Sequence, residues 1–164
     1  MSSEKKVQAS GVELRPPIRE DEAFLYQLYC STREEEVSAW GLEAAQLDML
    51  LKLQFTAQRR HFDIAFPESD VKIIVVGGEP AGRIITFRSE LEIRLVDIAL
   101  LPDYRNGGIG ARLIGELLDE GARTIRPVTL HVEKHNRAAR LYLRLGFSVT
   151  GDIGTHYKME WRPK

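Results

Sequence analysis

The chain has 164 residues and a mass of 18.6 kDa, which fits one domain of common size. Hydrophobic residues make up 43% and charged residues 29%, which excludes a chain too polar to build a core. A single cysteine excludes an internal disulfide framework and is typical of a reducing compartment. No apolar run approaches the roughly 20 residues of a spanning helix. We therefore expect one cytoplasmic domain over residues 1–164, with a polar tail over residues 1–10.

The net charge of −1 hides an asymmetry along the chain. Residues 1–100 hold 12 basic and 17 acidic side chains, whereas residues 101–164 hold 11 basic and 7 acidic ones. The second part therefore suits an anionic ligand and the first a cationic one, although a surface of mixed charge also gives such a split by chance. No basic cluster alternates with aromatic residues, which argues against a nucleic-acid partner.

Apolar periodicity and turn residues predict the elements of the first hundred residues. A short strand is closed by two prolines, and two amphipathic helices follow, separated by Gly41. Three strands come next, the first two joined by the hairpin signal Gly77-Gly78. In chain order these are a strand over 12–15, helices over about 20–36 and 42–61, and strands over 71–76, 80–87 and 91–101.

The last third of the chain predicts a helix over 108–123, a strand over 128–133, a helix over 136–145, and strands over 147–150 and 156–161. The order is thus β-α-α-β-β-β-α-β-α-β-β. Consecutive strands favour antiparallel pairing, and the later strand-helix-strand unit implies one parallel step. We expect an α/β fold with a mixed, mostly antiparallel central sheet and helices on both faces.

The stretch LLPDYRNGGIGARL, residues 100–113, carries the clearest chemical signal. A strand ends, a turn follows, and a helix opens just after three glycines: Gly107, Gly108 and Gly110. Bare backbone lets N–H groups approach a ligand closely, and a helix N-terminus adds free donors and partial positive charge. These features favour a phosphate site, against the alternative of a turn that only reverses the chain.

The glycine pattern excludes two common phosphate motifs. A P-loop needs a lysine followed by serine or threonine after its last glycine, and none is present. A dinucleotide fingerprint needs a third glycine where Leu113 stands, normally in an early strand-helix unit.

Residues 105–110, RNGGIG, resemble the Arg/Gln-x-x-Gly-x-Gly/Ala motif of the GNAT superfamily of acetyl-CoA-dependent N-acetyltransferases. The similarity continues in LHVEKHNRAARLYLRLGF, residues 130–147, which resembles the family's second block: a strand, an asparagine, a helix with small residues, a tyrosine and Gly-Phe. It covers roughly residues 70–162, whereas residues 1–69 agree only in the order of their elements.

The resemblance implies acetyl-CoA, or a close acyl relative, as cofactor. It implies that backbone amides of the glycine loop hold the pyrophosphate, here Arg105, Asn106, Gly107, Gly108, Ile109, Gly110 and Ala111. It implies that the preceding strand pairs with the pantetheine arm through Ile98, Ala99 and Leu100, and that Asn136 contacts the same arm. It also implies that Tyr142 protonates the departing thiolate, although a tyrosine on this apolar stripe also suits a core position.

The sequence offers several candidates for the general base that deprotonates the acceptor amine. An alkylammonium acceptor, with a pKa of about 10.4, must lose a proton before it attacks. Asp97, His131 and Glu133 are candidates, and the alternation of a strand places His131 and Glu133 on one side. His131 is favoured because it titrates near neutrality, against the alternative that each is an ordinary polar strand residue. The four histidines have no zinc-ligand spacing, so no metal site is predicted.

We therefore expect acetyl transfer to an amine, of a small molecule or a peptide, by direct transfer in a ternary complex. Glu34, Glu35 and Glu36 oppose the dipole of their helix and are candidates for attracting a cationic acceptor, or simply form a solvated turn. A different acyl chain and a non-catalytic coenzyme A sensor or subunit remain as alternatives. The resemblance also leaves a homodimer open, and no membrane partner is expected.

Overall fold

The computed structural model of the chain describes residues 11–164, so the predicted polar tail lies outside the described residues. The elements follow the predicted order: β1 (Val12–Arg15), α1 (Glu22–Ser38), α2 (Ala44–Ala65), β2 (Asp70–Val76), β3 (Glu79–Arg88), β4 (Ile93–Leu100), α3 (Ile109–Thr124), β5 (Val128–Glu133), α4 (Ala138–Arg144), β6 (Ser148–Asp152) and β7 (His156–Trp161). Short 3-10 turns, η1 (Arg19–Asp21) and η2 (Pro102–Tyr104), precede α1 and follow β4. None of the helices among these residues is long and apolar enough to cross a membrane.

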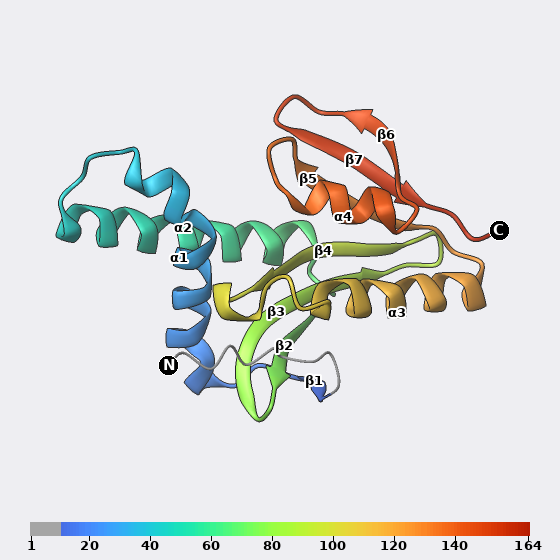
Figure 1. Ribbon diagram of the computed structural model, residues 1–164, viewed down its shortest axis with the longest axis horizontal. Helices are drawn as coiled ribbons and strands as arrows, with labels where there is room; N and C mark the ends of the chain where they lie inside the picture. The colour runs from blue at the N-terminus through green and yellow to red at the C-terminus, as the bar shows by residue number, and fades with distance from the viewer. Residues whose placement is uncertain (1–10) are drawn as a thin grey trace.

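The strands of the described residues form one sheet in the order β1-β2-β3-β4-β5-β7-β6 (Figure 1). Every neighbouring pair is antiparallel except β4 and β5, which run parallel. The predicted mixed, mostly antiparallel α/β sheet is therefore confirmed. The hairpin at Gly77-Gly78 is also confirmed, because both glycines have positive φ, a conformation that suits glycine in tight strand turns.

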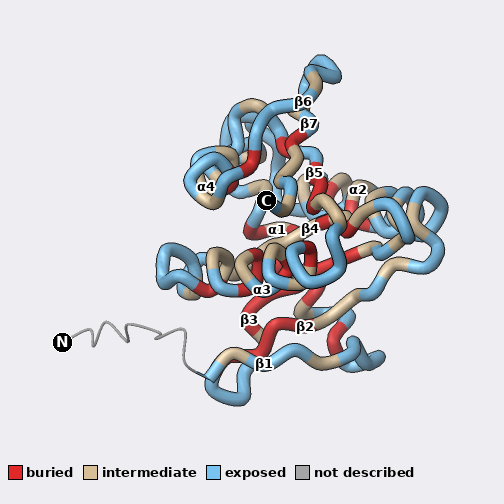
Figure 2. Tube along the Cα trace, turned by 90° about the vertical axis from the view of Figure 1, so that its right-hand side faces the viewer, coloured by how far each residue is buried: buried red, intermediate tan, exposed pale blue. Residues whose placement is uncertain are grey.

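Helices cover both faces of the sheet. On one face, Leu25 and Tyr29 of α1 pack with Phe55 of α2 against Ile73 and Val75 of β2. On the other face, α3 buries Leu113, Ile114 and Leu117 of its predicted apolar stripe, with Leu118 partly buried and Ile109 added, against β3, β4 and β5. Figure 2 shows that most of β2 and β3 is buried as a result.

Several boundaries differ from the prediction by a few residues, most of all the end of α2, which is Ala65 and not about residue 61. Two of these differences have identifiable reasons. β4 begins at Ile93 rather than residue 91, because the Ser89 hydroxyl accepts hydrogen bonds from the N–H groups of Leu91 and Glu92 and holds them in a turn. α4 begins at Ala138 rather than residue 136, because Asn136 stays outside the helix and its Oδ1 accepts from the Ala138 N–H. Both are local side-chain caps that compete with the regular backbone pattern.

A bulge in β4 separates it from β5. Asp97 pairs with Ile85 of β3 and Leu95 pairs with Thr86, so Val96 is an extra residue in β4. Pairing between β4 and β5 runs only from Ile93 to Leu95. A bulge bends its strand and increases its twist, so the two parallel strands diverge beyond this point. In Figure 1, β5, β6 and β7 accordingly group with α4, away from β2 and β3.

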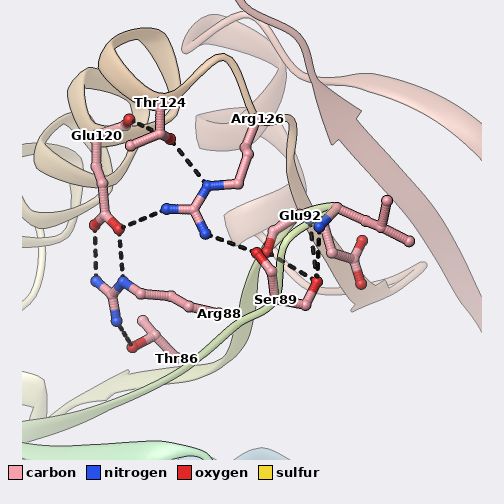
Figure 3. A network of polar contacts seen from close by, with 8 residues as sticks. Thr86, Arg88, Ser89, Glu92, Glu120, Thr124 and Arg126 are labelled. Atoms are coloured by element: carbon pink, nitrogen blue, oxygen red, sulfur yellow. Dashed lines mark hydrogen bonds and ion pairs between the residues drawn. The ribbon is translucent and has the colours of Figure 1, made fainter.

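A polar network fixes the turn from which β4 starts (Figure 3). Arg88 at the end of β3 makes two hydrogen bonds to Glu120 of α3, of 2.7 and 2.8 Å. Arg126 lies 3.6 Å from the same carboxylate and donates to the Ser89 carbonyl at 2.7 Å. The turn between β3 and β4 is thus joined to the C-terminal end of α3.

Candidate active site

A cavity of about 510 Å³ lies where β4 diverges from β5. Its walls come from distant parts of the chain: α1 and α2, the strands β3, β4 and β5, Asn136 and Tyr142 before and within α4, and Ile153 and His156 near the turn between β6 and β7. Of the residues proposed from the sequence, the cavity is lined by Asp97, Ile98, Ala99, His131, Glu133, Asn136 and Tyr142. The divergent strands therefore bring the catalytic candidates together with three of the predicted arm-binding residues, Ile98, Ala99 and Asn136.

The glycine loop ends at the N-terminus of α3. Gly108 is the N-cap residue with φ 85°, and Asn106 also has positive φ, so the loop needs the left-handed region twice. The first N–H groups of a helix have no intrahelical acceptor. A Cβ built on Gly108 would meet no atom within 4 Å, so the space beside this backbone is open. The backbone N–H groups of the loop therefore face open space at the positive end of a 16-residue helix. This arrangement suits an anion.

Arg105 turns back toward the protein. Its Nε donates to the Leu100 carbonyl at 2.9 Å, and its Nη2 lies 3.4 Å from both the backbone oxygen and the Oγ of Ser31 in α1. The side chain therefore ties the glycine loop to β4 and to the helix that lines the cavity. Leu100 itself packs its side chain against the core and does not line the cavity, unlike Ile98 and Ala99.

Asn136 lies at the cavity wall immediately before α4. Its Oδ1 is engaged by the Ala138 N–H at 2.9 Å. The amide NH₂ end is left to donate to a ligand.

Tyr142 is buried in α4, with 6% of its surface exposed, and packs on the Phe147 ring at a centroid distance of 5.7 Å. No group in residues 11–164 forms a hydrogen bond with its hydroxyl. Burial, with a smaller contribution from the negative charge of Asp97, raises the pKa of Tyr142 to about 12. The hydroxyl therefore stays protonated over the whole physiological range.

His131 and Glu133 share one side of β5, as their spacing predicted, and both line the cavity. Although His131 is exposed, partial desolvation beside β4 is the main cause that lowers its pKa, followed by the charges of Arg94, Lys158 and protonated His156. The imidazole is therefore neutral at pH 7 and has a nitrogen free to accept a proton. Glu133 lies 4.0 Å from the His156 ring, a contact that is ionic only when His156 is protonated.

Two arginines at the cavity were not identified from the sequence. Arg83 of β3 is 7% exposed and pairs with Asp97 at 2.7 Å. Arg94 of β4 lines the cavity with its guanidinium 5.8 Å from the Phe66 ring centroid. The sequence did contain a signal for both arginines, because each is a charged residue within an otherwise apolar strand. A charge in a buried position requires a partner or a ligand.

Only one of the three glutamates at the end of α1 lines the cavity. Glu36 lines the cavity and pairs with Arg33 at 2.9 Å, whereas Glu34 and Glu35 are exposed and do not line it. The hypothesis of a cationic acceptor therefore depends on Glu36. No set of three or more histidine, cysteine or acidic side chains among residues 11–164 is placed to hold a metal ion.

Comparisons with known proteins agree with this geometry. Residues 21–147 match the profile of the acetyltransferase (GNAT) family. The fold is similar to a PaiA N-acetyltransferase from Thermoplasma acidophilum solved in complex with coenzyme A, with a TM-score of 0.68, 18% identity, and coverage of 93% of this chain and 99% of that one. It is also similar to an acetyltransferase from Thermus thermophilus, with a TM-score of 0.64, 19% identity, and coverage of 96% and 99%. No curated protein sequence matches the chain at a significant level.

Proposed function

Because the chain belongs to the acetyltransferase (GNAT) family, we propose that it transfers an acetyl group from acetyl-CoA directly to an amine bound in the same complex. The proposal depends on one observation: the glycine loop and the candidate proton-transfer residues lie close to the same end of β4. The open donors of the glycine loop lie at the end of β4, and Tyr142, His131 and Asp97 line the cavity between β4 and β5. Phosphate binding and proton transfer are thus available side by side.

The chain's own groups suit coenzyme A. The N–H groups at the start of α3 suit a pyrophosphate, because they are donors at the positive end of a helix dipole. Beyond Leu95, β4 has no strand partner on its β5 side among the described residues, so its backbone groups are free to pair with an extended amide-containing chain. Asn136 offers its amide NH₂ group at the same gap. When bound there, acetyl-CoA supplies an acetyl group activated as a thioester.

His131 is the proposed proton acceptor for the amine. Its lowered pKa keeps the imidazole neutral at pH 7, so it accepts a proton from the acceptor's ammonium directly or through water. Asp97 is less suited to this role, because its carboxylate is held in the ion pair with Arg83. Glu133 shares the strand face with His131 and is the alternative base.

Tyr142 is the proposed donor to the sulfur that leaves. A thiol has a pKa of about 8.5, so the phenol of Tyr142 is a weaker acid than the group it serves. Complete proton transfer from Tyr142 is therefore uphill, and the benefit comes from a hydrogen bond to the developing negative charge. Such stabilisation in a site shielded from water helps turnover without being indispensable.

Thiol release from acetyl-CoA across a panel of polyamines, amino acids, aminoglycosides and peptide N-termini tests the proposal. We expect acceptor-dependent release and a product whose mass increases by one acetyl group. Calorimetry with coenzyme A is run on the same preparation. Tight coenzyme A binding without acceptor-dependent release from any amine would overturn the proposal in favour of a non-catalytic sensor.

A further inference from the structure

The cavity contains one cationic side chain without a counter-charge in contact. Three carboxylates line the cavity, and each lies beside a basic side chain: Glu36 beside Arg33 at 2.9 Å, Asp97 beside Arg83 at 2.7 Å and Glu133 beside His156 at 4.0 Å. Arg94 also lines the cavity, and within residues 11–164 it makes no ion pair and no hydrogen bond. The charges of this cavity therefore leave Arg94 without a partner of its own.

Arg94 is half-buried and lies near an aromatic ring. Its guanidinium carbon is 5.8 Å from the centroid of the Phe66 ring. Among residues 11–164, none of its N–H groups, which form the fork that recognises carboxylate and phosphate, makes a hydrogen bond. The negative charge of Glu92 acts on Arg94 without contact, and the Glu92 Oε2 accepts a hydrogen bond from Thr129 at 2.7 Å. Burial lowers the pKa of Arg94, and the charge of Glu92 only partly opposes this effect.

Two further polar groups at the same cavity are unsatisfied. Arg83, 7% exposed, has its Nε–H buried without an acceptor, although its Nη2 is engaged by Asp97. The buried Oε1 of Gln58, on α2, likewise has no partner. Both residues line the cavity, so an unpaired donor and an unpaired acceptor lie in its wall. Buried polar groups are nearly always paired, so unpaired ones in a cavity wall favour a polar ligand or water at that place.

Charged groups of both signs surround the cavity. Arg94 and Lys158 act on His131, and Glu92 opposes them. The carboxylates of Glu36, Asp97 and Glu133 already have basic neighbours. An amine acceptor that also engages Arg94 therefore carries a positive and a negative group.

We infer that Arg94 receives an anionic group of the acceptor, a carboxylate or a phosphate, so that the substrate is an amine with an anion at its other end. This inference rests on the proposed function and specifies its acceptor. The aromatic support of Arg94, the unpaired Nε–H of Arg83 and the absence of a contacting carboxylate carry it.

Matched acceptor pairs test the inference. Each pair has an anionic member and a neutral one: amino carboxylates with one to five carbons between amine and carboxylate against their primary amides, and phosphoethanolamine against ethanolamine. We expect wild type to prefer the anionic member of at least one pair. In Arg94→Gln, kcat/KM for that member should fall roughly 10- to 100-fold, the effect of a lost charged hydrogen bond, while the neutral member stays within about 3-fold. The carboxylate and phosphate pairs distinguish the two anions.

Arg33→Gln is the matched control, because Arg33 lines the same cavity but is already paired with Glu36. It should retain the preference for the anionic acceptor. Equal losses in the two variants would mean that only the general charge of the cavity matters, and would overturn the inference. Tm distinguishes a ligand-binding role of Arg94 from a structural one. Removing a desolvated cation without a partner should leave Tm unchanged or raise it, whereas replacing an arginine that stabilises the fold should lower Tm.

A binding experiment without acetyl-CoA makes the outcome independent of turnover. The N-acetylated products of the same amino carboxylates should raise the Tm of wild type and not that of Arg94→Gln. If neither the anionic acceptors nor these products are favoured by wild type, the inference fails. The proposed function survives that result if neutral amines are acetylated, and fails only if coenzyme A does not bind or no amine is acetylated.

Discussion

Tyr142 of α4 and Asp97 of β4 line the same cavity, and the negative charge of Asp97 adds to burial in raising the pKa of Tyr142 to about 12. The two residues come from elements on either side of the gap between β4 and β5. A carboxylate near the phenol disfavours the phenolate. The arrangement therefore keeps a proton on the tyrosine hydroxyl where the proposed chemistry needs one.

Replacing Tyr142 by phenylalanine removes only that hydroxyl. We expect turnover to fall by about 10²-fold, the low end for acid catalysis, because a thiolate is a fair leaving group by itself. Coenzyme A affinity should change little, since the ring and its packing on Phe147 remain. Steady-state kinetics and Tm on one preparation measure both effects. Tyr157→Phe is the control, because Tyr157 does not line the cavity. Wild-type turnover in Tyr142→Phe would remove this residue from the mechanism.

Gly108→Val should strongly weaken coenzyme A binding at the glycine loop. A side chain at residue 108 occupies the open space beside the first N–H groups of α3, and valine adopts the φ of 85° poorly. We expect calorimetry to show coenzyme A affinity lower by at least roughly 10-fold. Binding in wild type should also weaken as salt increases.

Gly110→Ala is the control for this loop. Gly110 has no positive φ, and a Cβ there would meet only Leu141 Cδ2 at 3.9 Å, an ordinary contact. The variant should therefore bind coenzyme A almost as wild type does. Unchanged affinity in a folded Gly108→Val protein would contradict the assignment of the loop.

The pH dependence of acetyl transfer should report His131. Its pKa is lowered, so the neutral, proton-accepting form predominates above the ordinary value of 6.5 and is lost as the pH falls through the lowered value. We therefore expect kcat/KM to fall on an acidic limb whose midpoint lies below 6.5. His131→Gln should remove that limb and reduce the rate on the plateau by about 10²-fold. His135→Gln should keep the limb, because His135 is exposed and does not line the cavity. If the acidic limb persists unchanged in His131→Gln, Glu133 becomes the proposed general base in place of His131.

The network around Glu120 should contribute to stability in a pH-dependent way. The hydrogen bond from Arg88 is the main cause that lowers the pKa of Glu120, so the stabilisation is present above the unfolded-state pKa and is lost as the pH falls through the lower folded-state value. Glu120→Gln should reduce the free energy of unfolding at pH 7 by about 1 to 2 kcal/mol, and the difference should shrink below about pH 4.3.

Urea titrations of wild type and Glu120→Gln at pH 7 and pH 3 measure this effect. Glu116→Gln is the control, because Glu116 lies one turn earlier on α3 and its contact with Arg112 is exposed. Its effect should stay below about 0.5 kcal/mol. Equal losses in the two variants, or a loss that does not depend on pH, would contradict the proposed role of the network.

The sequence by itself determined the elements and their order, because those depend on neighbours along the chain. The stripe of α3 was visible as apolar residues three and four apart, and Gly77-Gly78 marked its turn by the φ angles that glycine permits. The alternation in β5 likewise put His131 and Glu133 on one side, and both line the cavity.

Only the tertiary structure decided what the cavity contains. The bulge at Val96 depends on pairing with β3, the ion pair of Arg83 with Asp97 crosses between two strands, and the support of Arg94 by Phe66 joins β4 to the end of α2. Such contacts depend on where the backbone places residues that are far apart in sequence, and no local pattern encodes that distance. Periodicity assigns a side chain to a face of its element, whereas its partner on that face is set by the packing of the whole chain.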